Sequence, residues 1–456
     1  MKFPLLNKAG ALLGVTLGLM WALSSVQSVV HERQSRQLEA ERNVANSLAT
    51  SQTLMGPVLS RRCTETWLSG HASDGKPVMD SKTSFIRLPA TQINVSGKVE
   101  MTPRYRGMFK VNGYAAKPAV TAHWGSVAAL TPPPEFEGGR VECEAPVLGM
   151  ALTDARGIRV ADLTVLGRNL PVRPGSGLEA QPNGFQATLP DGLWASDTPL
   201  DLVLKLELAG TQTLSIAPVA NTTLVTLDSD WPHPSFGGRF LPSERQVLDH
   251  GFSATWKVTS LASTAQQEWL RGASLCQVMS DAEPVGDGKA NCIESFGVAF
   301  VDPVNAYVLG DRATKYGLLF IVLTFVGVGL VEVLRRLRVH PVQYLLVGAA
   351  LSVFFLLLVS LSEHMAFAHA YTAASLACTL LLGFYGSFVL QGWRAGTAFG
   401  AGIAALFGTL YALLQLEQTA LVLGAVMLFL VLAVIMVSTR KLDWYELMAE
   451  MRGQAA

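Results

Sequence analysis

The feature that most constrains this chain is a stretch of 122 residues, Tyr316 to Val437, that carries only 7 charged side chains. The segment before it, from His31 to Lys315, carries 55. Because so long an apolar stretch is not stable in water, we expect the last third of the chain to lie in a membrane. The charge distribution excludes a soluble cytoplasmic enzyme and a disordered protein. Basic and acidic residues are equal in number, 35 of each, so the composition gives no basic face for nucleic acid.

Six apolar runs are long enough to cross a membrane, since a helix needs about 20 mostly apolar residues to do so. One is N-terminal, at Ala11 to Val30. The other five, which together form a predicted bundle over residues 316–437, lie at Tyr316–Leu334, Val342–Leu361, Ala370–Gln391, Thr397–Leu416 and Thr419–Val437.

The first run could be a signal peptide, but it is longer than a signal core and no A-x-A cleavage site follows it. We therefore expect an uncleaved anchor. It continues into a helix-compatible extension, residues 31–56, which we expect to end at the breaker pair Gly56-Pro57.

Basic residues in the short connections predict the orientation of the spans. Lys2 and Lys8 precede the first span, and further basic residues follow the second, fourth and sixth: Arg335, Arg336, Arg338, Arg394, Arg440 and Lys441. We expect residues 1–10 and the tail 438–456 in the cytoplasm. The large segment 57–312 is then expected on the other side of the membrane.

That segment shows the alternation of apolar and polar residues that is typical of half-buried antiparallel strands. The clearest runs are Ser84–Leu88, Ile93–Met101, Leu202–Leu208, Leu224–Leu227 and Phe252–Val258. Frequent Gly and Pro turns between them favour a large all-β, sandwich-like domain. The predicted fold is thus an α+β membrane protein with six transmembrane helices, one N-terminal and five C-terminal.

Four of the five cysteines fall in the predicted β domain, where disulfides or a zinc site could use them. No pair has the two-to-four-residue spacing of a zinc knuckle, so disulfides are favoured. The expected pairs are Cys63 with Cys143 and Cys276 with Cys292. Cys378 lies within a span and is expected to be a small packing residue.

Two further groups could carry function. Trp231, His233, Pro234 and Phe236 form a compact cluster that is either a recognition loop or a rigid turn whose rings fill the β core. Glu363, His364 and His369 share a short loop and could bind a metal, although a solvated loop is the favoured interpretation. We predict no catalytic residue, no cofactor and no metal site.

Several longer motifs resemble one family, the bacterial inner-membrane CreD proteins, also called cell-envelope integrity proteins. They occur in order along the chain: Gly56–Leu59, Asp154–Ile158, Pro174–Leu178, Trp231–Phe236, Phe240–Pro242, Asp311–Tyr316, His340–Gly348, Ser362–His364 and Asp443–Tyr445. The resemblance implies a multi-pass protein of the Gram-negative inner membrane with its β domain in the periplasm. It implies a link to envelope stress, the β-lactam response and envelope integrity, and brings no enzymatic activity, cofactor or ligand.

On that resemblance, Asp311, Arg312, Lys315 and Tyr316 are expected to form a lock between the β domain and the membrane, since Tyr and basic side chains suit the headgroup level. His340-Pro341 is expected to begin the third span, because Pro is tolerated in the first turn of a helix.

We therefore expect a non-enzymatic envelope protein whose β domain binds another envelope protein or a cell-wall component, while the spans contact the lipid bilayer. The alternative is a transporter or permeation pathway formed by the five C-terminal spans. A signalling partner and an envelope enzyme are further possibilities, and the sequence does not indicate an oligomeric state.

Overall fold

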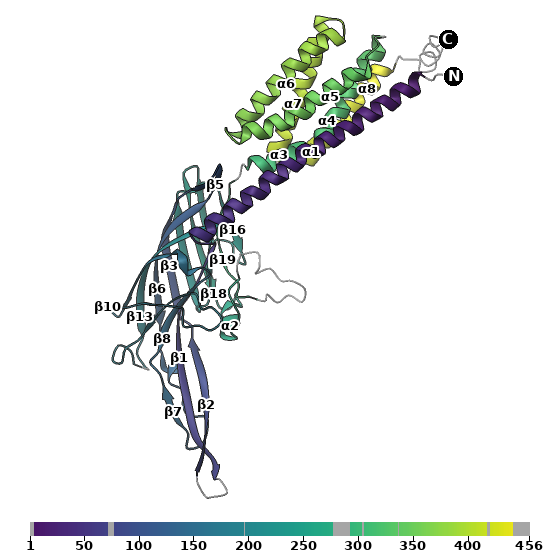
Figure 1. Cartoon of the computed structure of the whole chain (residues 1–456). Coiled ribbons are helices and arrows are strands. Elements are labelled where there is room, and N and C mark those ends of the chain that lie inside the picture. The colour runs from purple at the N-terminus through teal and green to yellow at the C-terminus, as the bar shows by residue number, and fades with distance from the viewer. Residues whose placement is uncertain are drawn as a thin grey trace. The chain divides into compact units, whose positions relative to one another are not determined.

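The computed structural model describes residues 4–71, 77–195, 197–276, 292–302, 305–335, 337–416 and 420–440. Two compact units make up the chain (Figure 1). The helical unit consists of residues 1–38 and 304–456, and the sandwich unit consists of residues 39–303. The sandwich unit is thus an insertion between the first helix and the remaining helices.

Six of the described helices are long and apolar enough to cross a membrane, as the sequence predicted. The helices that lie wholly or mostly in the helical unit are α1 Pro4–Ser47, α3 Ala306–Lys315, α4 Gly317–Leu334, α5 Pro341–Ser362, α6 Phe367–Val389, α7 Trp393–Gln415 and α8 Ala420–Thr439. The expected start of the third span is also found: α5 begins at Pro341, and His340 is its N-cap in a capping box with Gln343.

Two boundaries differ from the expected ones. The helical extension does not continue to residue 56, because α1 ends at Ser47 and a strand begins at Gln52. Gly56-Pro57 lies within that strand, where the register shifts between Met55 and Val58. Gly56 has φ +103, a conformation that L side chains rarely adopt, so the pair bends a buried strand and does not end a helix.

The second difference concerns α3, which falls in the segment that we assigned to the β domain and belongs to the helical unit. Part of this short helix is buried, and Leu309 and Ala313 belong to the packed core of the unit. Its N-cap is Asn305, whose side chain accepts a hydrogen bond from the Tyr307 N–H. Its hydropathy is too low for a span, which is why the apolar pattern missed it.

The sandwich unit contains two large sheets and a small ribbon. The nine-stranded sheet A runs in the order β11-β12-β8-β1-β14-β19-β16, with β2 and β7 also paired to β1. Its strands are β1 Gln52–His71, β2 Pro77–Leu88, β7 Arg140–Cys143, β8 Val147–Leu152, β11 Arg173–Pro174, β12 Gly184–Thr188, β14 Thr213–Ala217, β16 Pro234–Gly238 and β19 Phe296–Phe300.

The eight-stranded sheet B runs in the order β10-β9-β13-β6-β3-β15-β18-β17. Its strands are β3 Gln92–Met101, β6 Gly113–Trp124, β9 Ile158–Val165, β10 Arg168–Leu170, β13 Leu200–Thr211, β15 Thr222–Ser229, β17 Glu244–Leu248 and β18 Gly251–Thr259. The ribbon pairs β4 Arg104–Arg106 with β5 Phe109–Val111.

Both sheets contribute to one hydrophobic core, which makes the unit a sandwich. The alternation seen in the sequence is present in the structure: along β13, Leu200, Leu202 and Leu204 are buried, whereas Asp201 and Lys205 are exposed. Most strand pairs are antiparallel as expected, but β1 with β14 and β3 with β15 are parallel. The partners in each parallel pair are far apart in the chain, so no hairpin signal could reveal them.

Helices α6 and α7 approach closely through small residues. A Cβ on Gly396 would lie 2.5 Å from the Cα of Ser387, and one on Gly400 would lie 3.2 Å from the Cα of Gly383. Glycine permits this distance between helix backbones, which favours association within a membrane. Gly408, an exposed residue further along α7, has nothing within 4 Å of a built Cβ.

We predict that Gly396→Ala lowers the thermal midpoint of the full chain in detergent, by the equivalent of about 1–3 kcal/mol, because the added methyl would force α6 and α7 apart. Gly408→Ala is the matched control, and it should leave the midpoint unchanged or raise it, since alanine favours helix. Equal midpoints for the two variants would contradict the packing described here.

Candidate functional site

The segment Trp231–Phe236, a candidate recognition loop, leads into an edge strand. Its second half is β16, which pairs with β19 at the edge of sheet A. Phe236 packs edge-on against the rings of Phe252 and Trp256 in the sandwich core. His233 is exposed, and its carbonyl oxygen accepts a 2.9 Å hydrogen bond from the indole N–H of Trp231. The segment therefore has a clear structural role beside the last strand of the sandwich.

Trp231 lies in a polar cluster at the point where the chain leaves the sandwich. The Nζ of Lys110 sits 5.4 Å from the centre of the Trp231 ring and 3.7 Å from a carboxylate oxygen of Asp302. The side-chain amide of Asn112 donates to Asp302 at 3.0 Å and to the carbonyl of Phe300 at 3.1 Å. These contacts hold the end of β19 and the two residues after it.

The other connection, at which the chain passes from α1 into the sandwich unit, is stabilised by Asp154 and Arg156. The buried Asp154 carboxylate accepts hydrogen bonds from the Thr50 N–H at 3.0 Å and from the Arg156 guanidinium at 2.6 and 2.9 Å. The same guanidinium donates to the carbonyl of Asn46 in the last turn of α1. We call these four residues the entry clamp.

Other residues of the motif Asp154–Ile158 and its surroundings support the entry clamp. Gln52 donates to the carbonyl of Asp154 at 2.8 Å, and the Thr211 hydroxyl donates to the carbonyl of Ala49 at 3.0 Å. A Cβ on Gly157 would lie 2.3 Å from the carbonyl oxygen of Ala209, so only glycine fits there. This motif is one of those that resemble the family, and its structural role is visible only in the fold.

Asp311 and Lys315 lie on α3 in the helical unit, where a carboxylate oxygen of Asp311 is 2.8 Å from the Nζ of Lys315. The other oxygen is 3.4 Å from His31 of α1. Tyr316 ends α3 and packs at the edge of the helical core, and Arg312 lies on the same helix. The described partners of Asp311 thus connect α3 to α1, and the predicted lock to the β domain stays a prediction.

Glu363, one of the possible metal ligands, also contacts α1 and α3. Its carboxylate lies 3.3 Å from the Arg33 guanidinium of α1 and accepts a 3.5 Å hydrogen bond from the Tyr307 hydroxyl of α3. His364 and His369 are exposed. Within the described residues there is no group of three or more His, Cys, Asp or Glu side chains placed to hold a metal ion.

Glu332, at the end of α4, has partners that the sequence did not suggest. Its carboxylate contacts Lys8 of α1 and accepts hydrogen bonds from the Tyr344 hydroxyl at 2.8 Å and the Val339 N–H at 3.2 Å. Lys8 and Glu332 are 324 positions apart, so only the fold brings them together.

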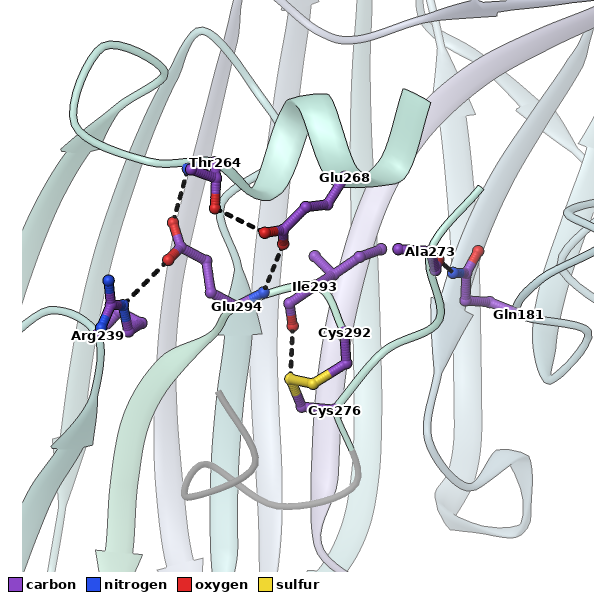
Figure 2. The surroundings of a disulfide bond; sticks show 9 residues. All are labelled: Gln181, Arg239, Thr264, Glu268, Ala273, Cys276, Cys292, Ile293 and Glu294. Carbon is purple, nitrogen blue, oxygen red and sulfur yellow. Dashed lines mark hydrogen bonds and ion pairs between the residues drawn. A yellow bond between two sulfur atoms is a disulfide. The ribbon is translucent and has the colours of Figure 1, made fainter. Parts of the chain in front are cut away.

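The four cysteines of the sandwich unit form two disulfides, Cys63–Cys143 and Cys276–Cys292, which is the pairing that we favoured from the sequence. Figure 2 shows the second one beside the short helix α2 (Ala265–Leu270). There the buried Glu294 carboxylate accepts hydrogen bonds from the Ser263 hydroxyl at 2.6 Å, the Thr264 N–H at 2.8 Å and Arg239 at 3.2 Å. These hydrogen bonds connect the residues just before α2 to the residues just before β19.

The first disulfide lies in an extension of sheet A that we call the arm: residues 61–71 of β1, 77–87 of β2 and 140–143 of β7. In Figure 1 these strands extend beyond the rest of the sandwich unit. Cys63 and Cys143 are register partners on β1 and β7. The buried Glu65 accepts hydrogen bonds from the N–H groups of Glu135 and Phe136, and Trp67 stacks on Phe136 at 3.8 Å. One face of the arm is therefore covered and braced.

The opposite face of the arm presents apolar side chains to solvent. Phe85 and Met79 of β2 are 45% and 60% exposed, and Leu68 of β1 is 49% exposed. The guanidinium of Arg62 lies 4.6 Å from the centre of the Phe85 ring. The apolar side chains on this face of a braced support are therefore accessible to another molecule. Sequence reasoning missed this face, because period-two alternation does not show which strands extend past the core.

The entry clamp changes the ionisation of Asp154. Burial alone would raise the pKa of this carboxyl, but hydrogen bonds from Arg156 and from the Thr50 N–H outweigh it and lower the pKa to about 2. Because the folded-state pKa is lowered, the stabilisation is complete above about pH 4 and is lost as the pH falls toward 2.

We predict that Asp154→Asn lowers the thermal midpoint of the full chain at pH 7, by the equivalent of about 1–3 kcal/mol, because buried donors lose a charged acceptor. The difference from the wild type should shrink as the pH falls from about 4 toward 2. The control is Asp201→Asn, which removes a largely exposed carboxylate of β13. Equal midpoints for the two variants at pH 7 would show that the entry clamp does not stabilise the fold.

Two comparisons with known proteins, one with a family model and one with a curated relative, give the same family. The family model described as "Inner membrane protein CreD" matches residues 4–445. The inner membrane protein CreD of Escherichia coli (strain K12) is 34% identical over 448 residues, covering 98% of this chain and 95% of that protein. A solved zinc M1 metallopeptidase of Deinococcus radiodurans, with a bound peptide substrate, covers 37% of this chain and 38% of its own at 11% identity. Its TM-score of 0.18 is too low to carry an argument. The chain therefore belongs to the CreD family of multi-pass inner membrane proteins.

Proposed function

We propose that this protein supports the integrity of the cell envelope under stress, including β-lactam stress, without catalysing a reaction. In this proposal the sandwich unit lies in the periplasm and binds another envelope component, while the spans hold it at the inner membrane. The observation that carries the proposal is the arm, whose braced strands present Leu68, Met79 and Phe85 to solvent.

Two features support the proposed placement. Arg335, Arg338, Arg394 and Arg440 all follow even-numbered spans, which favours a cytoplasmic location for those ends and for both termini. Both disulfides of the sandwich unit would persist in an oxidising periplasm.

The polar contacts at the two connections support a role in coupling. The entry clamp holds the end of α1, and the cluster of Lys110, Asn112 and Asp302 holds the residues after β19. In the helical unit, Asp311 and Glu363 hold α1 through His31 and Arg33. We propose that these contacts keep the chain ordered at both ends of the sandwich unit while the arm binds its partner.

The test is dye exclusion by a deletion strain under β-lactam stress, complemented with the double variant Met79→Ser and Phe85→Ser. The matched control is Val247→Ser with Leu248→Ser, which removes two similarly exposed apolar residues from the edge strand β17. Membrane levels of both proteins should be equal. We expect the control to restore dye exclusion and the arm variant to restore much less. Full restoration by the arm variant would rule out this surface as the binding site.

A further inference from the structure

The outer edge of β2, the edge strand of the arm, has no second strand beside it in the part of the chain that the structure describes. β2 pairs with one edge of β1, and β7 pairs with the other edge of β1 (Figure 1). Residues 77–83 and residue 85 of β2 are exposed. In an antiparallel pair every second residue directs its N–H and C=O away from the partner strand. A long exposed edge therefore offers a row of backbone groups to another strand.

Ser81 is one of the residues of β2 whose backbone groups face outward. Its N–H donates to the Asp80 carboxylate at 2.8 Å, a local hydrogen bond that does not involve β1. Because the pattern alternates, the backbone groups of Met79, Thr83 and Phe85 face the same way. Another strand can pair with these residues as far as Pro77, where pairing must stop because proline has no N–H.

The charges of β2 fit a second, antiparallel copy of the same strand. A twofold axis at Ser81 places Asp80 opposite Lys82 of the second copy, and this pair occurs twice by symmetry. Both pairs fall at positions without hydrogen bonds between them, where opposite side chains lie closest. An axis at Asp80 or at Lys82 would instead place like charges opposite each other. The charge pattern of β2 therefore favours one register of self-pairing.

The same axis matches the exposed length of the strand. The segment 77–85 is centred on Ser81, so Pro77 lies opposite Phe85 of the second copy. On the open face, Met79 and Phe85, which are 60% and 45% exposed, would join those of the second copy in one apolar surface. On the other face Lys82 contacts Glu135. Both side chains are about half exposed or more, at 49% and 62%, so the ammonium group stays accessible to a second carboxylate.

We propose that two copies of this chain associate through the outer edges of β2, with Ser81 of each copy on the twofold axis. Such a contact uses the same edge on both copies, so it closes as a dimer and leaves neither edge open. It would join the two arms in one continuous sheet. This association does not depend on the proposed binding of an envelope component, and its test is separate from the dye-exclusion assay.

The test is disulfide cross-linking of the full chain in isolated membranes, with copper phenanthroline as the oxidant. In the proposed dimer the Cα atoms of the two residues 81 lie about 5.5 Å apart, within reach of a disulfide. We therefore expect Ser81→Cys to give a covalent dimer that a reductant removes. Thr83→Cys is the matched control on the same strand and face. Its two copies would lie about 14 Å apart, so it should give no dimer above the wild-type level.

Charge reversal tests the register. Adding Asp80→Lys to Ser81→Cys should lower the dimer yield about tenfold, because two lysines then face each other at both pairs. Co-expression of that chain with one carrying Ser81→Cys and Lys82→Asp should restore the yield, because the mixed dimer again pairs opposite charges. Equal membrane levels and equal protease resistance confirm that each variant is folded. An unchanged yield with Asp80→Lys would contradict this register.

The proposal is overturned if Ser81→Cys gives no dimer. Equal yields from Ser81→Cys and Thr83→Cys would also overturn it, because they would indicate random collisions. A cross-linked product whose mass is not twice that of the chain would show that another protein occupies the edge of β2, and would exclude self-pairing there.

Discussion

The insertion of a large sandwich between two membrane-spanning helices is the constraint on which the rest of this structure depends. Its first strand must begin where α1 ends, and its last strand must stop shortly before α3. The Asp154 carboxylate stabilises the passage from α1 to β1 by accepting hydrogen bonds from Thr50 and Arg156. Arg156 also donates to the end of α1. Charge-assisted hydrogen bonds to a buried carboxylate are among the stronger polar contacts in a protein. The helix-to-strand transition therefore takes only a few residues.

Local contacts also stabilise the end of the sandwich unit after β19 and the arm. From the sequence, Trp231 and Phe236 could belong to a recognition loop or to a rigid turn that fills the core. In the structure Trp231 lies beside Lys110, and Phe236 packs in the core against Phe252. The arm depends on Cys63–Cys143, on the hydrogen bonds to Glu65 and on the stacking of Trp67 against Phe136. A covered face on one side leaves the other side available for contact. In the proposed function, the motifs shared with the family build the scaffold, and the arm presents the contact surface.

Much of the fold could be predicted because the bilayer imposes a simple rule on composition: the six spans follow from apolar length alone. Strand alternation likewise predicted the sandwich. The local errors have physical causes. Gly56-Pro57 was interpreted as a helix stop because both residues break helices, yet the positive φ of Gly56 serves a bend in β1. Helix α3 was missed because half of its surface is polar.

The candidate site was less predictable, because its contacts join residues far apart in the chain. Lys8 with Glu332 and His31 with Asp311 are visible only in the fold. Asp154, Arg156 and Gly157 did carry a signal, since an Asp-x-Arg-Gly sequence can cap a turn and bind a backbone carbonyl. Without the position of α1, that signal does not reveal its partner. The exposed face of the arm follows only from knowing where the core ends.

The most direct test of this account is hydrogen exchange of the full chain in lipid nanodiscs, comparing the wild type with Arg156→Gln. Peptides over residues 41–53 report the entry clamp, and peptides over 222–229, the interior strand β15, serve as the internal reference. We expect slow exchange over 41–53 in the wild type, faster exchange there in Arg156→Gln and no change over 222–229. Unchanged exchange over 41–53 in the variant would contradict the claim that this contact holds the sandwich to the end of α1.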